Sequence, residues 1–287
     1  MEVRRAVFAG SWYPAQPGEC EKAIQEFLKD PSITGEAPES AVGGIVPHAG
    51  WFFSGAIACN VIHALARAGP ADTVVLFGMH LHAASPGYLM LSGAWETPFG
   101  SIPIDSELAK GIARAYDFKV ETADHFTPDN TIELQLPFVK YFFKDVQLLP
   151  VGVPPHPDAL AVGKALVDLA NHAGKRIRIL GSTDLTHYGG NYGFTPKGRG
   201  PKALDWVKTE NDAAIIEALI GMNPHEVLSV AQSRQNACCA GAAATALEAA
   251  KALGAERAHC LAYATSYDKN PGESFVGYTG IVYSRIP

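Results

Sequence analysis

Short apolar runs alternate along this chain with longer segments in which apolar residues recur at helical spacing. The short runs predict strands over residues 41–46, 73–77, 88–92, 146–153, 177–180, 258–265 and 276–283. The longer segments predict helices over residues 18–29, 54–68, 106–116, 131–143, 157–172, 202–219 and 237–253. Strands that alternate with helices are typical of a central, mostly parallel sheet flanked by helices, so we predict an α/β fold.

The composition is that of a folded protein with a large core. Of the 287 residues, 47% are apolar and 18% are charged, which excludes an intrinsically disordered chain. The sequence contains no internal repeat and no segment with the composition of a linker. We therefore predict a single domain over residues 1–287.

Charge and hydropathy exclude two classes of partner. The formal net charge is −6 and no basic stripe with interleaved aromatic residues is present, so we expect no nucleic-acid binding. No apolar run approaches the roughly 20 residues that a membrane span needs, and the apolar stretch near the N-terminus is too short for the core of a signal peptide. The five cysteines are an odd number without a secretory signal, which favours reduced thiols and a cytoplasmic location.

Possible metal ligands follow three of the predicted strands. His48 comes after the strand over residues 41–46, and His80 and His82 come after the strand over residues 73–77. Asp184 and His187 follow the strand over residues 177–180. In an open α/β sheet the carboxyl ends of the strands form the ligand crevice. We therefore expect these side chains to share one pocket that serves as a metal or acid/base site.

Asp184 and His187 are three residues apart, a spacing that places both on one face of a helical turn. A carboxylate that accepts from one imidazole nitrogen fixes the tautomer and directs the other nitrogen at a metal or a substrate. The alternative is that Asp184, or a neighbouring hydroxyl, caps a helix while His187 faces solvent.

Cys238 and Cys239 open an alanine-rich predicted helix. A thiol at a helix N-terminus has a lowered pKa and favours the thiolate, which is the form that binds metal. The alternative is that these cysteines are small buried apolar residues, as most free cysteines are. Because adjacent helical residues differ by about 100° in direction, we expect only one of the two to face the pocket.

Glu133 and Gln135 interrupt a largely apolar stretch. If these two side chains are buried, they need hydrogen-bond partners and could support the residues of the site. The alternative is that they form an exposed face of the helix.

Five motifs together make the sequence familiar. They are AGSWYP at residues 9–14, VPHAGW at 46–51, WETPFG at 95–100, IELQLPF at 132–138 and STDLTHY at 182–188. In this order, and over nearly the whole chain, they resemble the Memo family, also called AmmeMemoRadiSam system protein B. The family's fold is similar to that of class III extradiol dioxygenases, which use non-haem Fe(II).

The resemblance also implies a set of site residues. The family's pocket carries two histidines and a cysteine, which fall here on His48, His80 and Cys238. His80 is preferred to His82 by its spacing to Ser85-Pro86. The spacing to Ala246-Leu247 favours Cys238 as the cysteine, whereas the spacing to Asn236 favours Cys239, and we choose Cys238. The family's Asp-x-x-His pair falls on Asp184 and His187, which are expected to act in proton transfer.

One departure from the family's pattern is clear. Where the family has His-Ser before Ile-Glu, this chain has Asn130-Thr131. If that histidine transfers protons in other members of the family, this chain lacks the group that does so.

We expect a metal-dependent oxidoreductase of dioxygenase type, in which His48, His80 and Cys238 hold Fe(II). A thiolate ligand also suits Cu or Zn. The alternative is a non-catalytic protein that uses the same pocket to bind a peptide or a small ligand, or that partners a radical-SAM protein, as the family resemblance implies. A zinc hydrolase, with His187 assisting a metal-bound water, is a third option.

Overall fold

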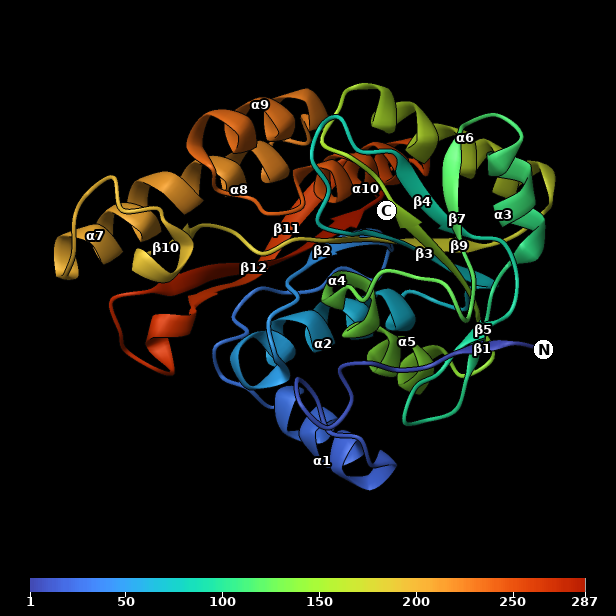
Figure 1. Ribbon diagram of the computed structural model, residues 1–287, viewed down its shortest axis with the longest axis horizontal. Helices are drawn as coiled ribbons and strands as arrows, with labels where there is room; N and C mark the ends of the chain where they lie inside the picture. The colour runs from blue at the N-terminus through green and yellow to red at the C-terminus, as the bar shows by residue number, and fades with distance from the viewer. Residues whose placement is uncertain (287) are drawn as a thin grey trace.

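Four parallel strands form the centre of the sheet in the computed structural model, which describes residues 1–286 (Figure 1). In spatial order these strands are β2 (Ala41–Val46), β9 (Ile177–Ser182), β3 (Thr73–Gly78) and β8 (Gln147–Gly152). Nearly all of their residues are buried because helices cover both faces of the sheet. This double burial explains why the four strands read as continuous apolar runs in the sequence.

Antiparallel pairings extend the sheet on both sides. Beyond β2 lie β12 (Phe275–Ser284), β11 (Arg257–Thr265) and β10 (His187–Tyr188). Beyond β8 lie β4 (Gly87–Met90), which is antiparallel to β8, and β7 (Phe118–Glu121), which is parallel to β4. A separate small sheet contains β1 (Val3–Arg4), β5 (Ala94–Trp95) and β6 (Ile102–Pro103).

Helices form a layer on each face of the sheet, as Figure 1 shows. The lower layer in this view contains α1 (Pro17–Phe27), α2 (Trp51–Arg67), α4 (Asn130–Glu133) and α5 (Leu136–Phe143). The upper layer contains α3 (Ser106–Ala113), α6 (Asp158–His172), α8 (Asp212–Ile220), α9 (Pro224–Arg234) and α10 (Ala240–Ala252). Helices α2 and α10 both pack on β2, so the strand that leads to His48 is held between them.

The prediction of an α/β fold with a central sheet flanked by helices is confirmed. The sheet is mixed rather than mostly parallel, with parallel strands at its centre and antiparallel pairings at β12 and β4. Two predicted helices differ in detail. The segment over residues 131–143 forms two helices, because Pro137, in the first turn of α5, has no N–H to continue the first helix. The segment over residues 202–219 contains a π-helical turn, Val207–Asn211, between α7 (Pro201–Trp206) and α8.

Strand β7 and helix α9 were not predicted, nor were the two-residue strands β1, β5, β6 and β10. Within residues 1–286, no helix combines the length and the apolar character needed to cross a membrane.

Candidate metal centre

His48 lies in the turn between β2 and α2, and its side chain is buried. Its backbone N–H donates to Oδ1 of Asp184 at 2.7 Å, and its Nδ1 lies 2.9 Å from Oγ of Ser182. The Ser182 hydroxyl donates its own proton to the carbonyl oxygen of Thr131, so it can only accept from His48. The proton therefore sits on Nδ1, and the lone pair of Nε2 is free for a ligand bond.

His80 follows β3 in a turn where Met79 has a φ of 73°. Both the backbone N–H and Nδ1 of His80 contact Oδ2 of Asp129, at 3.2 and 3.1 Å. Burial raises the pKa of Asp129, but hydrogen bonds from His80 and Thr131 outweigh it and lower that pKa to about 2. The ionised carboxylate accepts from Nδ1–H and leaves Nε2 of His80 as the available donor atom. His82 lies outside this cluster on the exposed surface.

Cys238 and Cys239 immediately precede α10. The Sγ atom of Cys238 lies 3.2 Å from Nε2 of His48 and accepts from the backbone N–H of Asp184 at 3.3 Å. The two cysteine sulfurs lie 3.8 Å apart. The expectation that only one cysteine faces the site was wrong. Cys239 is the N-cap, with φ −127° and ψ 53°, so the angular spacing of a regular helix does not apply to this pair.

The donor atoms of His48, His80, Cys238 and Cys239 all lie within 4.8 Å of one another. Burial raises the pKa of the Cys238 thiol, but the Cys239 hydrogen bond and the two histidines outweigh it, so this pKa lies well below its usual value. Burial lowers the pKa of His48, but Asp184 and Cys238 raise it by more, which leaves it above its usual value. The cluster therefore combines a thiolate with two imidazoles that each direct Nε2 at a shared point.

Among the described residues, no hydrogen bond joins the side chains of Asp184 and His187, so of the two predicted arrangements the structure has the one in which they only share a pocket. The segment between them is not helical, because Leu185 and Gly277 are joined by a backbone hydrogen bond and His187 begins β10. Asp184 binds the backbone of His48, and Nδ1 of His187 lies 3.2 Å from the carbonyl oxygen of Leu185. Burial raises the pKa of Asp184 above its usual value, although His48 opposes the shift. Both side chains nevertheless line one pocket with His48 and His80.

This pocket has a volume of about 600 Å³ and opens beside the donor cluster. Aromatic side chains form much of its rim, and they are well exposed: Trp12 at 41%, Phe52 at 66% and Tyr192 at 46%. Polar groups from Ser11, Asn130, Ser266, Asn270 and Ser274 also line it. None of the lining residues within the described chain is a lysine or an arginine.

Residues 4–282 match the Memo family, described as Memo-like protein. The chain belongs to the Memo family. It is 34% identical over 296 residues to a MEMO1 family protein of Methanopyrus kandleri, covering 99% of this chain and 100% of that protein. It is 33% identical over 289 residues to a MEMO1 family protein of Methanosarcina acetivorans, covering 98% and 99% of the two chains.

A solved structure shares the fold of this Memo-family chain. The crystal structure of an uncharacterized protein from Escherichia coli K12 superposes with a TM-score of 0.50 at 11% identity. The match covers 84% of this chain and 99% of that one. At this identity the likeness concerns the fold alone. The family resemblance inferred from the five motifs is thus confirmed by the family match.

Three residues near α4 support the site from behind in this member of the Memo family. Asn130, which stands where the motif comparison places a histidine, donates its Nδ2 proton to the carbonyl oxygen of His48 at 2.8 Å. Gln135 donates to the carbonyl oxygen of Pro47 at 2.9 Å. Glu133 accepts from the Tyr13 hydroxyl and from the backbone of the N-terminal segment that carries Trp12. The polar pair singled out in the sequence is therefore buried, and both side chains form hydrogen bonds, although Oε1 of Gln135 has no partner among the described residues.

The π-helical turn supplies a second support that the sequence did not reveal. Oδ1 of Asp212 accepts from the backbone N–H and the hydroxyl of Thr186, and Nδ2 of Asn211 donates to the same hydroxyl. Oδ2 of Asp212 accepts from the hydroxyl of Tyr263 at 2.8 Å. These bonds fix the segment that enters the pocket at His187. No spacing rule connects residues 186 and 212, so only the fold identifies this support.

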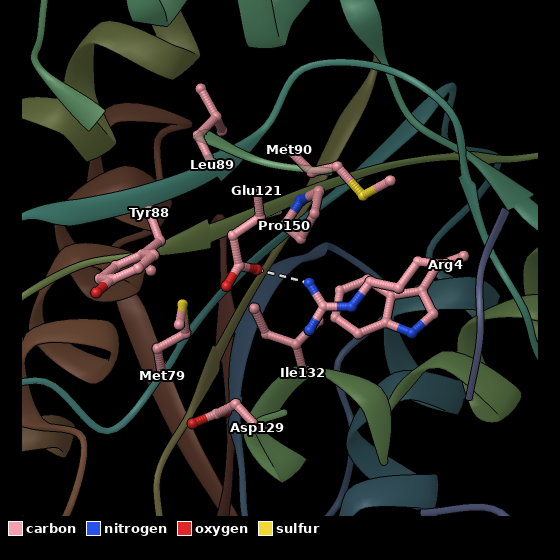
Figure 2. Close-up of a pocket in the computed structure, with 11 residues that line it drawn as sticks. Arg4, Met79, Tyr88, Leu89, Met90, Glu121, Asp129, Ile132 and Pro150 are labelled. Atoms are coloured by element: carbon pink, nitrogen blue, oxygen red, sulfur yellow. Dashed lines mark hydrogen bonds and ion pairs between the residues drawn. The ribbon is translucent and has the colours of Figure 1, made fainter. Parts of the chain in front are cut away.

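A second cavity, drawn in Figure 2, has a volume of only about 10 Å³. Nη1 of Arg4 reaches Oε2 of Glu121 at 2.6 Å beside this cavity, and the guanidinium lies 3.6 Å from the ring centroid of Trp95. A void of this size holds about one water, so it is not a ligand site. Met79 and Asp129 also line this cavity, so the buried ion pair lies next to the turn that carries His80.

Proposed function

We propose that this Memo-family protein is a metal-dependent oxidoreductase whose ion is held by His48, His80 and Cys238. The observation that carries the proposal is the convergence of nitrogen and sulfur donors at the carboxyl edge of the sheet, next to a pocket of about 600 Å³. Open α/β sheets bind ligands at this edge.

The residues fit a transition-metal ion. Each imidazole has its Nδ1 committed to an acceptor, Ser182 for His48 and Asp129 for His80, which is the usual arrangement of ligating histidines. A set of two imidazoles and one thiolate suits Fe(II), Cu and Zn, and a bound redox-active ion would supply electron transfer with O₂ or a substrate.

His187 is the proposed acid/base group. Donation from its Nδ1–H to the Leu185 carbonyl leaves the Nε2 lone pair able to take a proton from a pocket ligand. Asp184 acts beside it by fixing the backbone of His48 and by adding negative charge near the imidazoles. The buried hydrogen bond from the backbone N–H of Thr186 to Asp212 fixes the segment that carries His187.

The pocket lining favours a ligand with an aromatic or planar part. Aromatic faces of Trp12, Phe52 and Tyr192 can stack on such a ligand. A small molecule or an aromatic side chain of a peptide meets this description. The Cys238 thiol also requires a reducing compartment, which is consistent with the cytoplasm.

A second candidate function is binding without turnover. The exposed aromatic rim favours it, since Phe52 and Trp12 are accessible to a peptide or to a partner protein such as a radical-SAM enzyme. A zinc hydrolase would use the same donors and His187, but no additional observation favours it.

The test is anaerobic purification, elemental analysis and measurement of O₂ consumption with catechol and related electron-rich phenols. We expect about one bound ion per chain and turnover in the wild type. The variant His187→Asn should keep its ion and lose turnover by about 10²–10⁴-fold, as is typical for loss of a general acid or base. One bound ion per chain without turnover on any of these substrates would favour the binding function. A protein that takes up no ion would contradict both the oxidoreductase and the zinc hydrolase.

A further inference from the structure

We infer that Cys239 is a fourth metal ligand, so that the centre is a two-histidine, two-cysteine site for a thiophilic ion such as Zn(II) or Cu(I). This inference rests on the proposed metal-binding function and specifies which ion the same centre takes. It assigns a role to the second cysteine, which the three-ligand proposal leaves without one.

The separation of the two sulfurs carries the inference. Sulfur ligands bind zinc at about 2.3 Å in tetrahedral sites, and two such ligands on one ion therefore lie about 3.8 Å apart. The Sγ atoms of Cys238 and Cys239 lie 3.8 Å apart. The Cys239 sulfur is also within 4.8 Å of the donor nitrogens of both histidines, so a small adjustment brings all four atoms around one ion.

The surroundings of Cys239 hold its sulfur in this position. Its backbone N–H donates to Oγ1 of Thr183 at 3.1 Å, and the same hydroxyl lies 3.8 Å from the sulfur of Cys238. One threonine thus fixes both cysteines relative to each other. Among residues 1–286, the sulfur of Cys238 is the hydrogen-bond partner of the Cys239 thiol. By contrast, the thiols of Cys20 and Cys260 bond to backbone carbonyl oxygens.

The fourth donor narrows the choice of ion. Thiolates select thiophilic ions, and a tetrahedral set of two nitrogens and two sulfurs is typical of zinc. A fourth protein ligand also occupies a position that a dioxygenase iron keeps open for O₂ and substrate. Among the redox-active ions, copper therefore fits this centre better than iron does.

X-ray absorption of the zinc-loaded, reduced wild type tests the inference without any substitution. We expect two sulfur and two nitrogen scatterers per zinc. One sulfur per zinc would overturn the fourth ligand while leaving the proposed metal-binding function intact. Failure of the wild type to bind zinc, Cu(I) or Fe(II) would instead overturn the proposed function itself, and the inference with it.

Cobalt substitution with matched variants gives a second readout. Loading with Co(II) should produce thiolate-to-cobalt charge-transfer absorption that falls by about half in Cys239→Ser and by about half in Cys238→Ser. The zinc affinity of Cys239→Ser should fall by more than the roughly 10–100-fold that loss of a supporting contact costs. Cys260→Ser is the control, because it makes the same chemical change outside the cluster and should alter neither quantity. An unchanged absorption in a folded Cys239→Ser protein would contradict the inference.

Discussion

Nε2 of His48 lies 3.2 Å from the sulfur of Cys238, although 190 positions separate the two residues in the sequence. One residue follows the first central strand, and the other precedes the helix that packs on the same strand. This contact links the nitrogen and sulfur halves of the cluster. The positions of these donor atoms depend on hydrogen bonds from residues outside the cluster.

The first prediction concerns one of these bonds, between Asp129 and His80. Asp129→Asn should weaken zinc binding by about 10–100-fold, because the neutral amide holds the Nδ1 proton of His80 less strongly than the carboxylate does. Isothermal titration calorimetry with zinc measures the change. Asp124→Asn is the matched control, since Asp124 is exposed in the same loop and makes no contact with His80. Equal affinities for the two variants would contradict a supporting role for Asp129.

The second prediction concerns the aromatic rim. Trp12→Ala and Phe52→Ala should each raise the dissociation constant for catechol by about 3–10-fold, since each loses an aromatic contact of about 0.5–1.5 kcal/mol. The bound metal should be unchanged in both variants, because neither side chain belongs to the donor cluster. Ile220→Ala removes an exposed apolar side chain elsewhere and serves as the control. If all three variants bind catechol equally well, the rim is not the ligand contact.

The third prediction concerns pH and Asp212. Burial raises the pKa of Asp212 from 3.8 to about 6, although Thr186 and Tyr263 oppose the shift. Because this folded-state pKa exceeds the unfolded value, the stabilising contribution is complete below pH 4 and is lost as the pH rises through about 6. The free energy of unfolding should therefore fall between pH 4 and pH 7 by up to about 3 kcal/mol from this group.

Asp212→Asn provides the comparison, because the amide does not titrate and resembles the protonated acid. Urea unfolding of both metal-free proteins at several pH values should show a steeper loss in the wild type. If the free energy of unfolding changes with pH in the same way in both proteins, the prediction of a raised pKa for Asp212 is contradicted.

The fourth prediction concerns Gly277, whose backbone approaches the carboxylate of Asp212 closely. A Cβ atom at position 277 would collide with Oδ2 of Asp212, which is buried and fixed by its bonds. Gly277→Ala should therefore lower the free energy of unfolding by about 1–3 kcal/mol, a typical cost of overpacking. Gly18→Ala is the matched control, since nothing lies within 4 Å of a Cβ there and alanine favours helix α1. Equal stability of the two variants in urea would show that the segment around Asp212 can move.

The convergence of His48, His80 and Asp184 could be anticipated because the rule used was geometric. Parallel strands end at one edge of a sheet, and three buried apolar runs identify those ends without any tertiary information. The start of α9 was also readable, since Asn223-Pro224 followed by Glu226 is a helix N-terminal signal that the prediction passed over.

Other features depend on contacts that leave no local pattern. Asp129 supports His80 across 49 positions, and Asp212 supports Thr186 across 26. The placement of both cysteines at the cluster depends on the backbone of Cys239 before the helix begins, whereas periodicity describes only residues inside a helix. The same limit explains why Asp184 and His187 were expected to pair as on a helical turn.

The pairing of β12 with β2 has a consequence for how the protein is made. Strand β2 leads directly to His48, and 228 residues separate its last residue from the first residue of β12. During translation β2 therefore keeps one unpaired edge until the ribosome has released β12, and such an edge invites pairing with other chains. The strand that leads to His48 therefore gains its second neighbour only after β12 has been translated, and the proposed metal ion would bind to a site that is completed at that late stage.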